Sequence, residues 1–241
     1  MVQDIYLSNM KQLKVKNNFF IPKTPYERFA LDVYNLLVEN FSDTFFVGGM
    51  VRNLFWHKKI SDIDIATIAE PNHIARLLQK HNYQLNLSGR KFGVIGIMTG
   101  KKAVQVTTMR TERYSHNRYP EVVFTKSLQL DAVRRDFTVN SLYFQYKSCV
   151  VLDPCEGLPD IATKTLRTVG EPVKSFREDP LRIVRAWRFQ QEFNLKFETE
   201  TKKALHQLLP LTSKLTKTKL QTEINKSASQ NVKTFLQNKF G

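Results

Sequence analysis

The stretch that decides the fold is VGGMVRNLFWHKKISDIDIAT, residues 47–67. The apolar run 45–47 predicts a buried strand that ends at the Gly48–Gly49 turn, which we call the glycine turn. Residues 50–56 are typical of a short helix, and residues 63–67 of a second strand. A strand, a tight turn, a helix and another strand in so short a span indicate a mixed α+β domain.

Two carboxylates, Asp62 and Asp64, alternate with apolar Ile63 and Ile65 in the second strand. Side chains two residues apart on a strand point to the same side, so the aspartates lie together while the isoleucines are buried on the other face. Such close like charges repel unless a cation lies between them, and Mg²⁺ accepts carboxylate and phosphate oxygens together. Backbone N–H groups of the glycine turn can approach a phosphate where the short helix begins. The spacing therefore favours phosphoryl-type transfer over the alternative, a solvated edge strand.

The flanking sequence alternates helices and strands and then changes character. Thr24, Pro25 and Glu27 form a capping-box pattern that begins a helix ending near Asn40. Strand patterns stop at Glu178, after which we expect only helices. The remaining expected elements are a helix over 71–81, a hairpin of strands 92–98 and 103–107, mixed signals over 131–143, a strand over 150–152, and helices over 181–193, 200–209 and 214–227.

The domain organisation follows from the same patterns. Glycine and proline punctuate the chain at residues 170–172, where we expect a boundary. This predicts an N-terminal extension over 1–22, an α+β domain over 23–170, and a helical region with a basic C-terminal tail over 171–241.

Composition limits the class of protein. The 241 residues carry 37 Lys and Arg against 22 Asp and Glu, a net charge of +15 at pH 7. An apolar content of 41% excludes a disordered polyelectrolyte, and no apolar run approaches the ~20 residues of a membrane-spanning helix. Cys149 and Cys155 are too few for a disulfide scaffold and lack the spacing of a zinc site. We expect a cytoplasmic location, with a mitochondrial one left open because the N-terminal segment is basic.

The positive charge is concentrated towards the C-terminus. Residues 201–241 contain eight lysines and a single acid, Glu223. A basic helical tail favours a polyanionic partner, and the alternative is a solvated helix surface.

The stretch 47–67 resembles the nucleotidyltransferase signature of the class II tRNA nucleotidyltransferases and bacterial poly(A) polymerases. Further motifs follow in the order of that family: VQVTTMRTE resembles its Glu-containing strand and flexible loop, RRDFTVNSLYF its ribose-recognition motif, DPCEGLPDI its linker motif, and EDPLRIVRAWRF its nucleotide-templating helix. These ordered motifs identify the chain as a member of the family. The resemblance implies a nucleotidyltransferase head with a polymerase-β-like palm, an α+β fold, followed by an all-helical neck.

The resemblance also implies roles for residues of the head. Asp62 and Asp64 would hold two catalytic Mg²⁺ ions. Arg52, one helical turn past the glycine turn, would reach the triphosphate as a fixed cation with a donor fork. Arg135, Asp136 and Asn140 resemble the set that selects a ribose. The alternative for the run Arg134, Arg135 and Asp136 is a surface ion-pair cluster. The full nucleotide-binding set in the head comprises Gly48, Gly49, Arg52, Arg135, Asp136 and Asn140.

A second group of roles falls in the helical region. In the family, an acid and an arginine one turn apart act as a protein template for the incoming base, which implies Asp179 and Arg182 here. Asp179 also has the local pattern of a helix N-cap. Arg182, Arg185 and Arg188 recur every three residues and therefore line one helix face, where a triphosphate or an RNA backbone would bind.

Several features depart from the family pattern. Gln105 stands where the family usually carries a Glu that faces the paired aspartates, so a neutral amide replaces a third carboxylate. Asn53 and His116 each replace a usual Asp, which we expect to alter positioning. At 241 residues the chain is also short for a family whose members continue into helical body and tail domains that grip the tRNA. A naturally short member, half of a split enzyme and a cut chain are the alternatives.

We therefore expect a template-independent RNA nucleotidyltransferase that adds C and/or A residues from CTP and ATP to the 3′ end of tRNA. A poly(A) polymerase is the alternative within the class. From another class, Gln105 and the short chain motivate a non-catalytic RNA-binding relative, or one subunit of a split enzyme whose partner subunit supplies the missing body and tail. No membrane partner is expected, and no oligomeric state is predicted.

Overall fold

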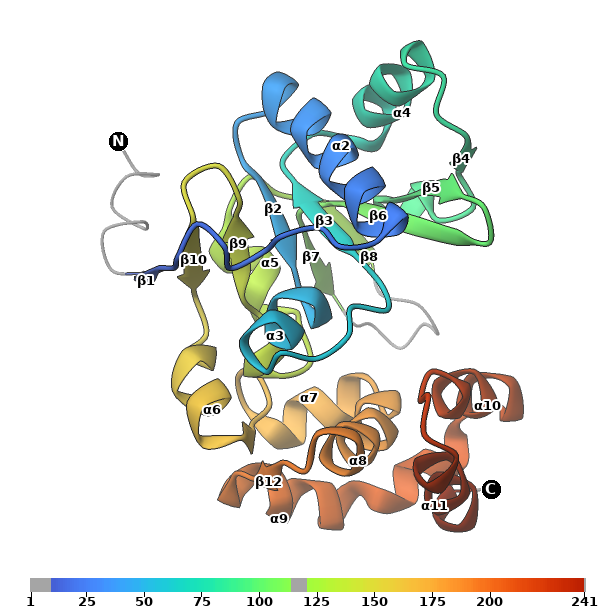
Figure 1. Ribbon diagram of the computed structural model, residues 1–241. Helices are drawn as coiled ribbons and strands as arrows, with labels where there is room; N and C mark the ends of the chain where they lie inside the picture. The colour runs from blue at the N-terminus through green and yellow to red at the C-terminus, as the bar shows by residue number, and fades with distance from the viewer. Residues whose placement is uncertain (1–9, 114–120, 241) are drawn as a thin grey trace. The chain divides into compact units, whose positions relative to one another are not determined.

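The computed structural model describes residues 10–113 and 121–240 (Figure 1). The chain forms two compact units. The head unit contains the residues up to Arg135 together with Asn140–Gly157, and the neck unit contains Asp136–Val139 and the chain from Leu158 onward. The boundary expected near residue 170 therefore falls inside the neck unit.

An eight-stranded sheet forms the centre of the head unit, in the order β1-β10-β9-β2-β3-β6-β5-β4. Only β3 and β6 are parallel among its neighbouring pairs. The strand β1 comes from the region expected to be an extension, and it pairs with β10 at the sheet edge. The strands are β1 (Lys11–Lys14), β2 (Thr44–Val47), β3 (Asp64–Thr67), β4 (Leu85–Asn86), β5 (Val94–Thr99), β6 (Lys102–Thr108), β9 (Tyr143–Gln145) and β10 (Val150–Asp153).

Helices and one hairpin complete the head unit. The expected capping box begins α2, because the Thr24 hydroxyl accepts from the Glu27 N–H at 3.2 Å while the Glu27 carboxylate accepts from the Thr24 N–H at 3.3 Å. No helix of the described residues is long and apolar enough to cross a bilayer. The remaining elements here are α2 (Pro25–Asn40), α3 (Gly49–Phe55), α4 (Pro71–Lys80), the short helix η1 (Arg90–Phe92), the hairpin β7 (Arg110–Arg113) with β8 (Glu121–Phe124), α5 (Leu128–Val133), and η2 (Thr138–Asn140), which crosses between the units.

The alternation of side chains along β2 explains why both faces of the sheet are covered. Phe46 stacks on Tyr34 of α2, with ring centroids 4.5 Å apart. Phe45 and Val47 point to the opposite face, where they join a buried cluster that includes Ala132 of α5. The helices α2 and α5 therefore cover opposite faces, as Figure 1 shows for α2 lying across the sheet. The apolar run 45–47 is buried on both sides for this reason.

The neck unit is mainly helical. Asn194 ends α8 in the left-handed conformation, with φ of 52°, and the chain then pairs Lys196–Phe197 in parallel with Thr165–Leu166. The expectation of helices alone after Glu178 is therefore wrong for this two-residue strand. The elements are α6 (Gly157–Thr163), β11 (Thr165–Leu166), α7 (Pro172–Glu178), α8 (Leu181–Phe193), β12 (Lys196–Phe197), α9 (Thr199–Leu208), η3 (Leu209–Lys214), α10 (Lys217–Asn225) and α11 (Gln230–Phe240).

Candidate active site

The carboxylate pair lies at the end of the sheet where β2 leads into the glycine turn. Asp64 is the first residue of β3, and it is paired across the ladder with Val47 on one side and Gln105 on the other. Ile63 and Ile65 are fully buried, whereas Asp62 is exposed and Asp64 is half-buried. Side chains of paired residues share a face of a sheet, so Asp64 and Gln105 lie on the same face. The predicted burial of the two isoleucines is confirmed, and β3 begins at Asp64, two residues after Asp62.

A tyrosine from α2 holds the segment that carries the carboxylates. The Tyr26 hydroxyl accepts from the Ile63 N–H and donates to the Ala103 carbonyl, both at 3.0 Å. It therefore joins the residue just before β3 to β6. Lys102 donates to the Ser61 carbonyl at 3.2 Å, and its ammonium group lies 4.6 Å from the centre of the Tyr26 ring. Burial, with the charges of Asp62 and Asp64 added, raises the pKa of Tyr26 to about 12. Tyr26 therefore stays neutral and can keep both hydrogen bonds.

The glycine turn brings charged groups together. Gly48 has φ of +73° and ψ of −135°, a backbone conformation that favours glycine. A Cβ placed on Gly48 would lie 3.6 Å from Nη1 of Arg135 and 3.8 Å from Oδ2 of Asp64. A Cβ on Gly49 would lie 3.4 Å from Nη2 of Arg52. Two guanidinium groups and one carboxylate thus gather at a turn that has no side chain of its own.

Arg52 is held in place by two amide side chains. Its Nε and Nη2 donate to Oδ1 of Asn53 at 3.1 and 2.9 Å, and its Nη1 donates to Oδ1 of Asn140 at 2.5 Å. Asn53 in turn donates to the Lys59 carbonyl at 2.8 Å. The guanidinium is buried, with 6% of Arg52 exposed. Because the Asn53 amide fixes Arg52 without neutralising it, the substitution of the usual Asp leaves more positive charge at the turn.

The carboxylates can serve a metal ion together with a substrate. Mg²⁺ is usually bound through one or two carboxylates plus substrate phosphates and waters, which the exposed Asp62 and half-buried Asp64 can supply. Among residues 10–113 and 121–240, no group of three or more His, Cys, Asp or Glu side chains could hold a metal ion. This agrees with an amide, Gln105, beside Asp64. The donor set therefore fits a cation that completes its coordination with phosphate oxygens.

The residues expected to select a ribose are divided between the units. Arg135 and Asn140 belong to the head unit, and both approach Gly48. Asp136 belongs to the neck unit, where its Oδ2 accepts from Nε of Arg185 at 2.8 Å. Arg185 and Asp136 are therefore an ion pair of the neck unit.

The start of α8 carries the residues expected to read the base. Oδ1 of Asp179 accepts from the Leu181 N–H at 3.0 Å. The N-cap of α8 is Pro180, and Asp179 ends α7, so the expected N-cap lies one residue later in the chain. Nη1 of Arg182 donates to the Ser175 hydroxyl of α7 at 2.7 Å. Oδ1 of Asp179 is therefore engaged with the backbone at the first residue of α8.

Arg188, the last arginine of the α8 stripe, is buried and paired with two acids. It is 7% exposed, and its Nε donates to Glu223 of α10 at 2.8 Å while its Nη1 donates to Glu192 at 2.9 Å. Glu223 is 1% exposed and also pairs with Arg185 at 3.7 Å and Lys226 at 2.7 Å. The arginine stripe of α8 is thus packed against an acid of α10.

Sequence reasoning missed three residues that organise the site region. Asp131 lies four residues before Arg135, a helical pairing distance that could have revealed it. Glu223, the single acid of the basic tail, could have been read as a partner for the arginine stripe. No sequence pattern indicated Tyr26, because its hydroxyl bonds to Ile63 and Ala103, which are distant from it in the sequence. The substitution expected to matter at His116 lies outside the described residues.

Comparison with known proteins places these features in a family. The sequence matches the family described as the poly A polymerase head domain over residues 44–167. It is 31% identical to poly(A) polymerase I of Haemophilus influenzae over 230 residues, which cover 90% of this chain and 50% of that protein. It is 36% identical to the CCA-adding enzyme of Geobacillus stearothermophilus over 206 residues, covering 85% of this chain and 50% of that protein. The chain spans about half the length of these relatives.

Solved structures show the same similarity. The CCA-adding enzyme of Bacillus stearothermophilus in complex with CTP superposes with a TM-score of 0.71 at 31% identity, over 90% of this chain and 49% of that one. A tRNA nucleotidyltransferase complexed with a primer tRNA and an incoming ATP analog gives a TM-score of 0.66 at 27% identity, over 86% of this chain and 60% of that one. The fold expected from the sequence, an α+β head with a helical neck, is confirmed.

Proposed function

The chain belongs to the poly(A) polymerase head-domain family, and from that premise we propose that it is a template-independent RNA nucleotidyltransferase. The reaction is the addition of C and/or A residues from CTP and ATP to the 3′ end of tRNA. The observation that carries the proposal is the gathering of Asp64, Arg52 and Arg135 around the glycine turn. Carboxylates for a cation, next to two fixed guanidinium groups, are the parts that nucleotidyl transfer requires.

The head residues have separate tasks in this reaction. Asp62 and Asp64 would hold two Mg²⁺ ions, which would supply Lewis-acid activation of the attacking hydroxyl and of the triphosphate. Arg52 and Arg135 bind triphosphate oxygens through their N–H groups and offset the charge that develops on the leaving pyrophosphate. The tRNA 3′-hydroxyl oxygen forms a bond to the α-phosphorus, and the bond from the α-phosphorus to the pyrophosphate oxygen breaks.

The neck unit supplies base recognition in this proposal. The second oxygen of Asp179 and the N–H groups of Arg182 offer an acceptor and forked donors to the Watson–Crick edge of the incoming base. Asp136 and Arg185 form an ion pair that joins α8 to the segment just before η2. Arg188, bound to two acids, acts through the position of the helix.

A primer series tests the function directly. Purified protein with Mg²⁺ receives tRNA transcripts that end before CCA, after one C, and after CC, each with CTP, ATP or both. Completion of CCA, or of the CC or A part alone, supports the proposal. Long A tails on any RNA support poly(A) polymerase activity, the candidate favoured by the similarity to poly(A) polymerase I. Failure to incorporate either nucleotide on every primer contradicts both enzymatic functions.

The carboxylate pair has its own test. Asp62→Ala removes one of two carboxylates from an exposed position, so incorporation is expected to be lost while RNA affinity stays within twofold. Asp32→Ala, an exposed aspartate on α2, is the matched control and should retain full incorporation. Retained incorporation in Asp62→Ala would remove Asp62 from the proposed metal site.

A further inference from the structure

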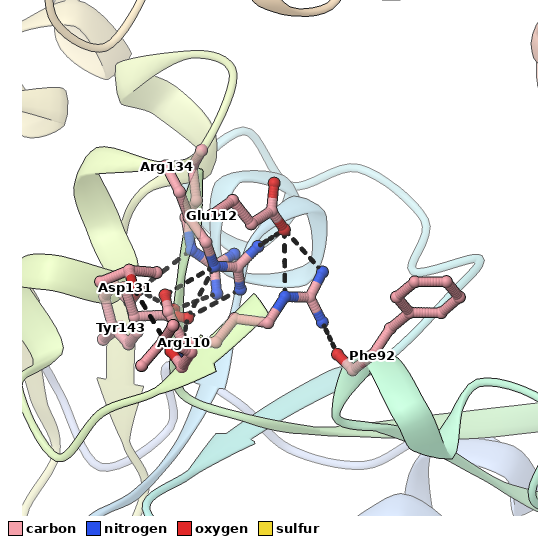
Figure 2. Close-up of polar contacts among 9 residues, drawn as sticks. Phe92, Arg110, Glu112, Asp131, Arg134 and Tyr143 are labelled. Atoms are coloured by element: carbon pink, nitrogen blue, oxygen red, sulfur yellow. Dashed lines mark hydrogen bonds and ion pairs between the residues drawn. The ribbon is translucent and has the colours of Figure 1, made fainter. Parts of the chain in front are cut away.

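A cluster of charged side chains lies in the head unit beside the proposed nucleotide site (Figure 2). We call it the arginine cluster, and it consists of Arg110, Glu112, Asp131, Arg134 and Arg135. The arginine side chains are 14% exposed and the Glu112 side chain 10%, while Asp131 is fully buried. Burying this many charges is costly unless each is paired, so the pairing indicates a specific arrangement.

The two oxygens of Asp131 serve different parts of the head. Oδ1 accepts from the Arg110 N–H at 3.0 Å and from Nε and Nη2 of Arg134 at 2.9 and 2.7 Å. Oδ2 accepts from Nη2 of Arg135 at 3.0 Å and from the Tyr143 hydroxyl. Burial favours protonation of Asp131, but the charges of Arg135 and Arg134 outweigh it and hold its pKa below the ordinary range. The carboxylate is therefore ionised whenever the protein is folded near neutral pH.

The Oδ2 side of Asp131 fixes how Arg135 points. Nη2 of Arg135 is bound to Asp131, and Nε donates to the Tyr143 hydroxyl at 3.0 Å. The same guanidinium lies 4.9 Å from the centre of the Tyr143 ring. Nη1 is the atom nearest Gly48, at 3.6 Å from the position of a Cβ there. The guanidinium is thus held along one edge with Nη1 at the glycine turn.

The Oδ1 side of Asp131 is tied to the β7–β8 hairpin. Nη1 of Arg134 pairs with Glu112 at 3.3 Å, and Nη2 of Arg110 pairs with the same oxygen at 2.8 Å. Nη1 of Arg110 donates to the Phe92 carbonyl of η1 at 2.6 Å, as Figure 2 shows. Asp131 therefore stands between the hairpin and Arg135 and contacts both.

We propose that Asp131 is a positioning residue for nucleoside triphosphate binding, which orients Arg135 at the glycine turn while its other oxygen is fixed by Arg134 and the β7 backbone. The inference rests on the proposed function, because it takes Arg135 as a ligand of the triphosphate. Asp131 itself does not touch the nucleotide. Its effect on affinity passes entirely through Arg135, and this distinguishes it from a residue that only stabilises the fold.

A double-mutant cycle on nucleotide affinity tests this coupling. The dissociation constant for Mg²⁺–CTP and Mg²⁺–ATP is measured by calorimetry on the full chain for wild type, Asp131→Asn, Arg135→Ala and the double variant. Each single variant is expected to bind about tenfold more weakly, which corresponds to one lost charge-assisted hydrogen bond. The double variant should bind no more weakly than Arg135→Ala alone, because the two residues act as one unit. Additive losses would overturn the proposal.

Matched variants separate positioning from folding. Tyr143→Phe removes only the hydroxyl between Asp131 and Arg135, so it should weaken nucleotide binding about threefold. If Asp131→Asn does not fold, the test uses Tyr143→Phe in its place. Glu27→Gln alters a buried carboxylate that caps α2 away from Arg135, and should leave nucleotide affinity within twofold. Unchanged affinity in both Asp131→Asn and Tyr143→Phe, with normal primer extension, would overturn the positioning role and leave the proposed function standing. A wild-type chain that neither binds nor adds nucleotides would overturn both.

Discussion

At residue 105, a neutral amide stands beside Asp64 where the family resemblance leads one to expect a carboxylate. Oε1 of Gln105 would lie 3.6 Å from a Cβ on Gly96 of the neighbouring strand, which is an ordinary van der Waals contact. An amide oxygen can bind a hard cation but brings no charge. In the proposed metal site, two carboxylates would neutralise less of the charge of a bound metal ion than three would. The substrate phosphates would then contribute more to metal binding.

We predict that Gln105→Glu increases the affinity for divalent metal measured without nucleotide. A third carboxylate on the same face should raise Mn²⁺ affinity about tenfold, since cation affinity rises with the charge of the ligand set. Mn²⁺ titration followed by electron paramagnetic resonance gives the value directly. Gln79→Glu adds the same charge on the exposed surface of α4 and should leave affinity unchanged. Equal affinities in wild type and Gln105→Glu would place residue 105 outside the metal site.

Single residues also show how far the sequence could lead. The alternation of Asp62 and Asp64 with isoleucines predicted the burial of both isoleucines, because period two is a local property of strands. The three-residue spacing of the α8 arginines predicted a shared face but not what covers it. Arg188 meets Glu223 of α10, and that contact depends on how helices pack. The local pattern therefore predicted which face of its element a side chain occupies, whereas the residue that it contacts depends on tertiary packing.

At the scale of elements, the glycine turn combines a backbone requirement with a binding requirement. Gly48 and Gly100 both have positive φ, +73° and +60°. A Cβ on Gly48 would meet Arg135 and Asp64, whereas a Cβ on Gly100 would have no atom within 4 Å. An alanine at Gly100 would therefore show the effect of backbone strain alone, whereas an alanine at Gly48 would also affect the proposed nucleotide site.

We predict that Gly48→Ala and Gly100→Ala each lower the free energy of unfolding by about 1–2 kcal/mol, the cost of holding an alanine at positive φ. Urea denaturation measures this effect. Only Gly48→Ala should also weaken Mg²⁺–ATP binding, by roughly tenfold, because the methyl group would occupy the space beside Nη1 of Arg135 and Oδ2 of Asp64 where we propose that the phosphates bind. Equal nucleotide affinity in the two variants would show that the turn does not contact the phosphates.

The packing of α10 on α8 depends on Glu223. We predict that Glu223→Gln lowers the free energy of unfolding by about 2 kcal/mol at pH 7, because charge-assisted bonds to Arg188 and Lys226 are weakened. Burial favours protonation, but Arg185, Arg188 and Lys226 lower the pKa of Glu223 below its ordinary value of 4.5. Its contribution is therefore fully present above pH 4.5 and is lost as pH falls through the folded pKa.

Urea titrations from pH 7 down to pH 3 should accordingly show the gap between wild type and Glu223→Gln narrowing below about pH 4.5. Glu200→Gln is the control, since Glu200 pairs with Lys203 at an exposed position and should change stability by less than about 0.5 kcal/mol. A gap that stays constant with pH would mean that the pKa of Glu223 is the same in the folded and unfolded states.

Element boundaries followed the sequence where local signals were strong. The capping box predicted the start of α2, and helical periodicity predicted α8 over the same residues that the structure gives it. The strand β12 could not be foreseen, because two residues carry no period and their pairing with β11 is set by the fold. The same holds for β1, whose four residues are all exposed and gain strand character only from β10.

For the whole molecule, the net charge of +15 divides into parts with different partners. Arg134, Arg185 and Arg188 are paired with acids of their own unit, so they contribute little charge to an external polyanion. Lysines of the basic tail are likewise of two kinds. Lys226 pairs with Glu223, and the ammonium group of Lys239 lies 4.0 Å from the centre of the Trp187 ring. Lys214 and Lys217 are exposed on η3 and the start of α10.

These differences predict unequal roles in RNA binding among residues of equal charge. Lys214→Ala with Lys217→Ala should weaken tRNA affinity and reduce the slope of log affinity against log salt by about one for each lysine removed, since each phosphate contact releases counterions. Lys226→Ala with Lys239→Ala removes the same charge from lysines that contact Glu223 and Trp187, and should mainly lower the unfolding midpoint. Filter binding across a range of salt concentrations, with urea denaturation alongside, compares the two pairs. Identical salt slopes for the two double variants would contradict this prediction. The positions of the lysines on the neck unit would then make no difference, and tRNA affinity would depend only on the net charge of the tail.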